Sequence, residues 1–194
     1  MYASVCPNPF RLDAGVGFTS NVLNGALAQT LLVNDVSEKA SILKDYAEYI
    51  FGTIDKAVEG LTEKEMNWRP TEQSNNIEWI LNHLARLSNV SLPRIISGDP
   101  NYMPKGWPQD YKDQHYAMEK MVKDIQAGKK VVFEGIGKLT NAQLEEEVPL
   151  WGGKQKRKTG LFAYLGELIH HKGQIAYIRG TVKRLKEKDP KFLA

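Results

Sequence analysis

The chain has 194 residues, a formal net charge of +3 from 26 basic and 23 acidic side chains, and a hydrophobic fraction of 42%. These values are typical of one soluble domain with a short appendage, and a chain of this length folds without a disulfide or structural metal. The single cysteine excludes an intrachain disulfide and a CxxC site, and the balanced charge argues against whole-molecule attraction to nucleic acid.

The first 36 residues are expected to form an extension ahead of the main domain. Residues 1–20 are rich in Gly, Pro, Asn and Ser, which is typical of irregular chain, and residues 21–33 favour a short amphipathic helix. Polar residues interrupt that segment, and no run of 18 apolar residues occurs, so neither a signal peptide nor a membrane span is indicated. We therefore expect a cytoplasmic protein.

Residues 37–188 are predicted to form a single helical domain. Apolar residues recur at steps of three and four, which is typical of amphipathic helices. Four such helices are predicted, at about 37–60, 75–98, 111–138 and 159–186. Because little credible strand lies between them, the pattern predicts an all-α bundle.

Three local features refine this prediction. Pro93 is expected to kink or shorten the last turn of the second helix, which then ends at Gly98. Residues 99–110 are dense in Pro, Gly and Asn and predict a loop. A short hairpin is expected near residues 148–158, around Gly152 and Gly153.

Two ionisable residues of the last helix are predicted to face the bundle interior. At 100° per residue, His171 lies within the apolar stripe, and Glu167 lies about 40° from it, one turn earlier. A buried carboxylate is costly unless it is partnered, and a divalent cation is one such partner. Together with inward-facing His83 of the second helix, they supply the ligand set of catalytic zinc and facial-triad metal sites.

Other roles for these residues stay open at this point. An inward histidine is often a hydrogen-bonded core residue, and Glu167 with His171 could form a simple charge-assisted pair. His170 points about 100° away from His171, toward the flank of the helix, where it would contact a ligand or an interface. His115 is expected on the surface or at the lip of a site.

Two segments resemble motifs of one protein family. NNIEWILNHLARLSNV, residues 75–90, resembles the I-x-W-x-L-x-H-L signature of the DinB-like (damage-inducible) superfamily. GELIHHKGQIAYIRG, residues 166–180, resembles the H-x-x-x-H-R/K-G-Q motif of the same family. The resemblance covers about residues 37–186, including LTEKEMNWRP between the first two helices.

The resemblance implies an up-down-down-up four-helix bundle, often a homodimer, that binds a divalent metal (Ni, Zn, Mn or Fe) through three histidines. His83 matches the first ligand and His171 the third, while Glu167 occupies the second position, where the family usually has histidine. This departure implies either a metal site that prefers harder ions or a buried ion pair without metal.

The resemblance also implies a function. Characterised relatives include thiol-dependent S-transferases and a thiol-dependent isomerase, and others are described as metal-dependent hydrolases. We therefore expect a metalloenzyme acting on a small molecule, with a low-molecular-weight thiol as cosubstrate in the transferase case because Cys6 is poorly placed. His170, Gln174 and Tyr164 are candidates to contact the metal ligands or the substrate.

Two alternatives remain. One is a non-catalytic, stress-associated dimeric binding protein in which Glu167 and His171 form a structural pair. The other is nucleic-acid binding through the basic segments at 154–158 and 183–191, which is disfavoured because no docking motif accompanies the charges.

Overall fold

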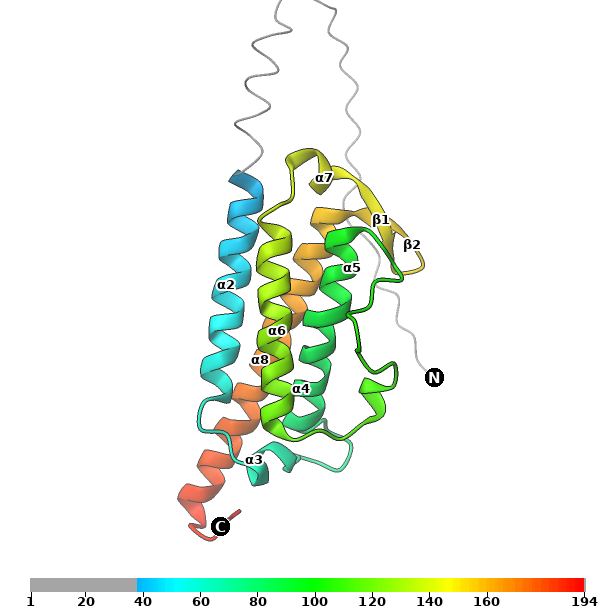
Figure 1. The fold of residues 1–194 in the computed structure, drawn as a ribbon. Helices are drawn as coiled ribbons and strands as arrows, with labels where there is room; N and C mark the ends of the chain where they lie inside the picture. Colours follow the sequence, from blue (N-terminus) through cyan, green and yellow to red (C-terminus); the bar gives the residue numbers. More distant parts are fainter. Residues whose placement is uncertain (1–37, 194) are drawn as a thin grey trace, which may run out of the picture.

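Four helical segments form a bundle in residues 38–193, the part of the chain that the computed structural model describes (Figure 1). The helix expected at residues 21–33 and Cys6 lie outside the described residues. No helix in the described part is long and apolar enough to cross a membrane. The bundle consists of α2 (Glu38–Val58), α4 (Ile77–Arg86) continued by η1 (Leu87–Ser91) and α5 (Leu92–Ser97), α6 (Met118–Ile136) and α8 (Arg157–Lys188).

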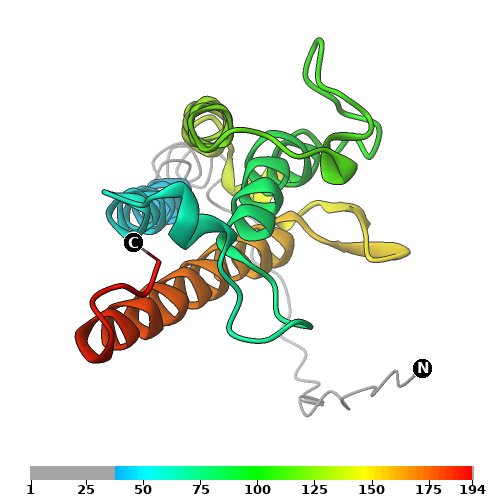
Figure 2. The same cartoon turned by 90° about the horizontal axis from the view of Figure 1, so that it is seen from below.

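The helix directions confirm the expected topology. In Figure 1, α2 and α8 run downward, whereas α4–α5 and α6 run upward. Since α4–α5 and α6 point the same way, the chain returns between them by a long crossover, which contains the short 3₁₀ helix η2 (Tyr111–Asp113). Helix α2 packs against α6 and α8, and α4 packs against the same two helices, as the view from below shows (Figure 2).

The core is built from the predicted apolar stripes. Each long helix directs one stripe inward, and burying a large aliphatic or aromatic side chain contributes about 1.5–3 kcal/mol. At the bottom of the bundle, α3 (Glu63–Asn67) connects α2 to α4 and adds Met66 to this core. Side chains less than 2% exposed come from all four helices and include Ile50, Phe51, Ile80, Leu84, Ile125, Ile136, Leu168 and Ile175.

The second helix runs on through a π-helical turn, η1, and then meets Pro93. The Leu92 N–H donates to the Leu87 carbonyl five residues earlier. The helix ends at Gly98 as predicted, and this glycine adopts the left-handed conformation (φ 76°). A proline has no N–H for the carbonyl four residues before it, and a π-turn is one way to absorb that loss. The expected shortening at Pro93 is therefore replaced by a change of helix type.

The third helix begins at Met118, and its prediction from about residue 111 is wrong. The Asn82 Nδ2 donates hydrogen bonds to the carbonyls of Tyr111 (2.9 Å) and Gln114 (3.2 Å), which occupies acceptors that an α-helix would use. Tyr111 is buried, and its hydroxyl donates to Asp124 (2.6 Å). The crossover is therefore fixed to the core before α6 starts.

The predicted hairpin is present, with its turn one residue earlier than expected. After the short helix α7 (Asn141–Glu145), strand β1 (Glu147–Leu150) pairs antiparallel with β2 (Gly153–Lys156). The two turn residues are Trp151 (φ 53°) and Gly152 (φ 76°), the pattern of a type I′ turn. Buried Arg157 fixes the base of the hairpin by donating to the carbonyls of Ile95 (3.1 Å) and Gln143 (2.7 Å).

Two glycine-to-alanine substitutions should shift stability in opposite directions. A Cβ at Gly128 would lie 2.5 Å from Ser88 Cβ, so Gly128→Ala forces α6 away from the π-turn and should destabilise by about 1–3 kcal/mol. A Cβ at Gly52 meets nothing within 4 Å, so Gly52→Ala should stabilise α2 by about 0.5–1 kcal/mol. Urea unfolding measures both, and a Gly128→Ala variant as stable as Gly52→Ala would contradict the close packing.

Candidate metal site

Helices α4 and α8 bring three potential metal ligands together in their interface. Asn76 is the N-cap of α4, and its side chain accepts the Trp79 N–H (3.0 Å). Half-buried His83 lies on the side of this helix that faces α8. Glu167 and His171 face α4 from one side of α8, one turn apart. We call His83, Glu167 and His171 the His–Glu–His trio.

The distances within the trio are short. His83 Nε2 lies 3.0 Å from Glu167 Oε1, and His171 Nε2 lies 3.8 Å from the same oxygen. One ligand atom of each of the three residues lies within 4.8 Å of the others. The predicted convergence of these residues is therefore present in the fold.

The donor set fits a divalent transition metal. Ligand atoms about 2.1 Å from one ion in tetrahedral geometry lie about 3.4 Å from each other, so the trio needs only small side-chain adjustments. Two imidazoles and a carboxylate suit Zn, Ni, Mn or Fe. The side chain of Glu167 is 37% exposed whereas that of His171 is 8% exposed, so the trio is closed toward the core and open toward solvent.

Hydrogen bonding orients His171 for ligation through Nε2. Its Nδ1 lies 2.8 Å from Gln174 Oε1, and since an amide oxygen only accepts, Nδ1 carries the proton and Nε2 keeps its lone pair. The Gln174 amide nitrogen then donates to Nε2 of exposed His170 (2.9 Å). The predicted candidates Gln174 and His170 thus form one hydrogen-bonded chain that ends at His171.

Trp79 holds the other imidazole in place. Its ring stacks on His83 with centroids 5.3 Å apart and an interplanar angle of 18°. The sequence analysis includes this tryptophan only as part of a motif. Its contact with His83 could have been predicted from their spacing of four residues, because residues i and i+4 of a helix are neighbours.

The pKa of His171 is lowered from its usual 6.5. Burial is the main cause, and it outweighs the opposing hydrogen bond with Gln174, while the nearby His83 lowers the pKa further. The neutral imidazole that a metal requires is therefore the stable form near pH 7.

In the alternative without metal, Glu167 is expected to pair with His171, but its nearest imidazole is that of His83. Glu167 lies within hydrogen-bonding distance of His83, whereas its 3.8 Å separation from His171 is too long for a hydrogen bond. The closest contact within the trio is therefore the one between Glu167 and His83, which joins two helices, and the contact along α8 is the longer one.

Tyr164 and His115, the remaining predicted residues, have their partners outside the trio. Tyr164 stacks against Trp151 of the hairpin (centroids 6.4 Å apart), one turn before Glu167. The side chain of His115 is 89% exposed, and its Nδ1 lies 2.6 Å from Glu78 Oε1. It lies on the surface, as one of the two expectations had it, and lines a small cavity with Trp79 that contains none of the trio.

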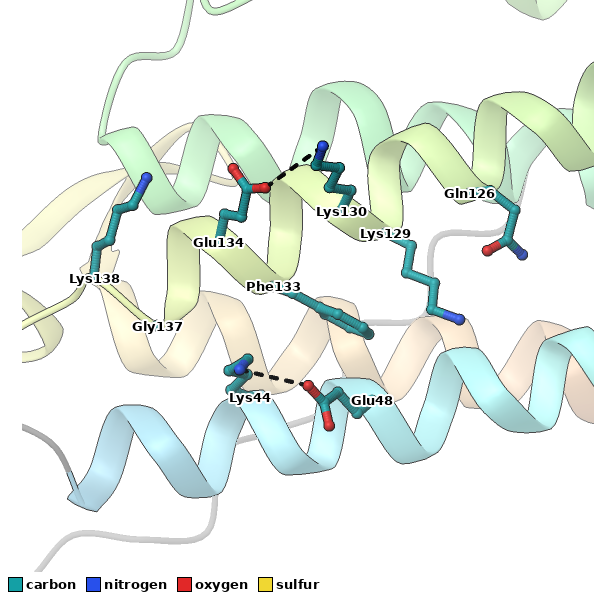
Figure 3. Close-up of a pocket in the computed structure, with 9 residues that line it drawn as sticks. All are labelled: Lys44, Glu48, Gln126, Lys129, Lys130, Phe133, Glu134, Gly137 and Lys138. Carbon is teal, nitrogen blue, oxygen red and sulfur yellow. Dashed lines mark ion pairs between the residues drawn. The ribbon is translucent and has the colours of Figure 1, made fainter.

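A groove between α2 and α6 is rich in lysine, but acidic side chains neutralise most of these charges (Figure 3). Lys44 pairs with Glu48 (3.6 Å), and Lys130 with Glu134 (4.0 Å), each within one helix. Lys129 reaches Asp55 (2.9 Å). The lysines of this groove have no metal-ligating role, and the groove lies in a different helix interface from the trio.

The basic segment at 154–158 is also partly neutralised. Lys158 and Lys156 both hydrogen-bond Glu145 and lower its pKa to about 2. Arg157 is buried. The positive charges of this segment are therefore not all exposed and free to bind a polyanion such as nucleic acid.

Replacing His171 with Gln should flatten the pH dependence of stability in metal-free protein. Because the folded-state pKa of His171 is below 6.5, the unfolded chain binds a proton that the folded chain resists as the pH falls through 6.5. The stability contributed by neutral His171 is complete above that pH and decreases below it. Urea unfolding from about pH 7.5 to about pH 5 measures this, and equal slopes for both proteins would refute it.

Comparisons with known proteins concern the family and the fold. A family model of the DinB superfamily matches residues 51–175, which include the whole trio. A conserved protein from Enterococcus faecalis has a similar crystal structure, with a TM-score of 0.57, 15% identity, and coverage of 72% of this chain and 94% of that chain. A DinB-like protein from Bacillus subtilis is 17% identical, with a TM-score of 0.47 and coverage of 78% and 91%.

A search of curated proteins gave no match. The family match spans well over half of the chain and contains both histidine motifs. The chain therefore belongs to the DinB superfamily.

Proposed function

We propose that this protein is a divalent-metal-dependent enzyme that acts on a small molecule. The observation that carries the proposal is the His–Glu–His trio, in which two helices place two imidazoles and one carboxylate within 4.8 Å. Membership of the DinB superfamily does not by itself specify a reaction.

The reaction class that we propose is hydrolysis or thiol-dependent S-transfer. A divalent cation held by the trio would supply Lewis acidity that lowers the pKa of water or of a low-molecular-weight thiol. The role of the chain's own residues is orientation. Gln174 fixes the proton of His171 on Nδ1, Trp79 fixes the ring of His83, and the exposed side of Glu167 leaves room for a substrate.

The surroundings of the trio favour a small molecule over a polyanion. Two cavities border α8 on either side of the trio, one of about 710 Å³ lined by His170 and Gln174 and one of about 480 Å³ lined by Tyr164. Both volumes are in the range of small-molecule sites. The neutralised basic segment at 154–158 also supports this reading, and the homodimer stays a prediction from the resemblance.

Elemental analysis of purified variants tests the proposal. Wild type should hold about one Ni, Zn, Mn or Fe per chain, and His83→Ala and Glu167→Gln should reduce metal affinity by more than about tenfold because each removes a ligand. Glu167→His should keep the metal and shift its preference toward Ni and Zn, which favour imidazole. Glu48→Gln, which removes a surface carboxylate of the α2–α6 groove, is the matched control.

Two results would contradict the proposal. One is a wild-type protein that holds no metal and shows no thermal stabilisation by added Zn, Ni, Mn or Fe. The other is a Glu167→Gln variant that binds metal as tightly as Glu48→Gln does. Either result would favour the non-catalytic alternative, in which Glu167 is only a structural partner of His171 and His83.

A further inference from the structure

A cavity of about 480 Å³ lies where the β1–β2 turn, α5 and α8 meet. Ser91 and Arg94 line it from the second helix, Pro149 and Trp151 from the hairpin, and Tyr164 from α8. Among the described residues that line it, only Arg94 is charged. The cavity thus combines one cation with aromatic and apolar surface.

Arg94 is held at one end of its guanidinium. Its Nε donates to the carbonyl of Tyr102 in the crossover (2.9 Å). No other hydrogen bond or ion pair of this side chain is formed within residues 38–193. Its two terminal nitrogens are therefore available to a ligand, and their fork geometry matches a carboxylate.

Trp151 is an unusual residue for its position in the turn. The first residue of a type I′ turn has positive φ, which favours Asn, Asp or Gly, and a bulky side chain there costs on the order of 1 kcal/mol. Trp151 is 59% exposed. Its indole stacks on the ring of Tyr164 with an interplanar angle of 11°. The preference of the turn does not explain a tryptophan at this position. A tryptophan that forms an aromatic wall of a binding site would explain it.

The position of this cavity connects it to the trio. Tyr164 precedes Glu167 by three residues, which is about 4.5 Å along the axis of α8. Tyr164 therefore places one wall of the cavity within one helical turn of Glu167. The larger cavity beyond His170 has no lysine or arginine among its described lining residues, so it lacks the fork of donors that Arg94 offers to a carboxylate.

We propose that this cavity binds the aromatic carboxylate portion of the substrate. The carboxylate pairs with the terminal nitrogens of Arg94, and the ring packs against Trp151 and Tyr164. A single cation in an otherwise neutral cavity matches a carboxylate better than a dianionic phosphate. The inference rests on the proposed metalloenzyme function and specifies its substrate class as aromatic acids.

Calorimetric titration of the full-length protein with 2-naphthoate tests the inference, with 2-naphthamide as an uncharged ligand of similar shape. Wild type should bind the acid at least about tenfold more tightly than the amide. Arg94→Gln should abolish this preference. Lys130→Gln removes one positive charge in the α2–α6 groove and should keep the preference.

Trp151→Asn separates recognition from folding. It creates the Asn-Gly pair that a type I′ turn prefers, so the thermal midpoint should stay the same or rise. Affinity for both the acid and the amide should nevertheless fall by about fivefold or more, because the stacking surface is lost. Retained affinity in this variant would overturn the assigned role of Trp151.

Equal affinity of wild type for 2-naphthoate and 2-naphthamide, or an unchanged preference in Arg94→Gln, would overturn the inference. Because Arg94→Gln leaves the trio unchanged, loss of the acid preference in this variant reports recognition by Arg94 and not by a metal. A metal-free wild type that still prefers 2-naphthoate would overturn only the proposed metalloenzyme function.

Discussion

The burial of His171 between α4 and α8 is the constraint on which the site depends. His171 is nearly buried, and burial lowers its pKa, so it is held as a neutral base in contact with an apolar core. Glu167 shares the same interface and has the imidazole of His83 as its nearest partner. Such a cluster is stable only when every member is partnered, and a cation bound by all three would partner each one.

The rest of the bundle holds α4 and α8 at the separation that this cluster requires. Asn89 of the π-turn η1 donates a hydrogen bond to the Asp124 carbonyl of α6 (2.7 Å). Gly128 of α6 allows α6 and η1 to approach closely. Arg157 ties the start of α8 to the end of α5. These contacts lie outside the trio, yet they fix the two helices that carry it.

Much of this arrangement could be predicted from the sequence. Apolar periodicity identified four helices and the inward faces of His83 and His171, because both depend on local helix geometry alone. The start of α6 could not be predicted, since it is set by Asn82, which is distant in sequence from the carbonyls that it binds. The cross-helix pairing of Glu167 with His83 and the Arg94–Trp151 cavity likewise depend on tertiary contacts and have no local pattern.

X-ray absorption spectroscopy of the zinc-loaded protein tests the central claim most directly, because it reports the atoms bound to the metal independently of activity. The trio predicts a shell of nitrogen and oxygen only, at about 2.0–2.1 Å, with the multiple-scattering signature of two imidazoles. The imidazole contribution should fall to one in His83→Ala. A sulfur ligand, or a shell without imidazole, would contradict the assignment of His83, Glu167 and His171 as the metal site.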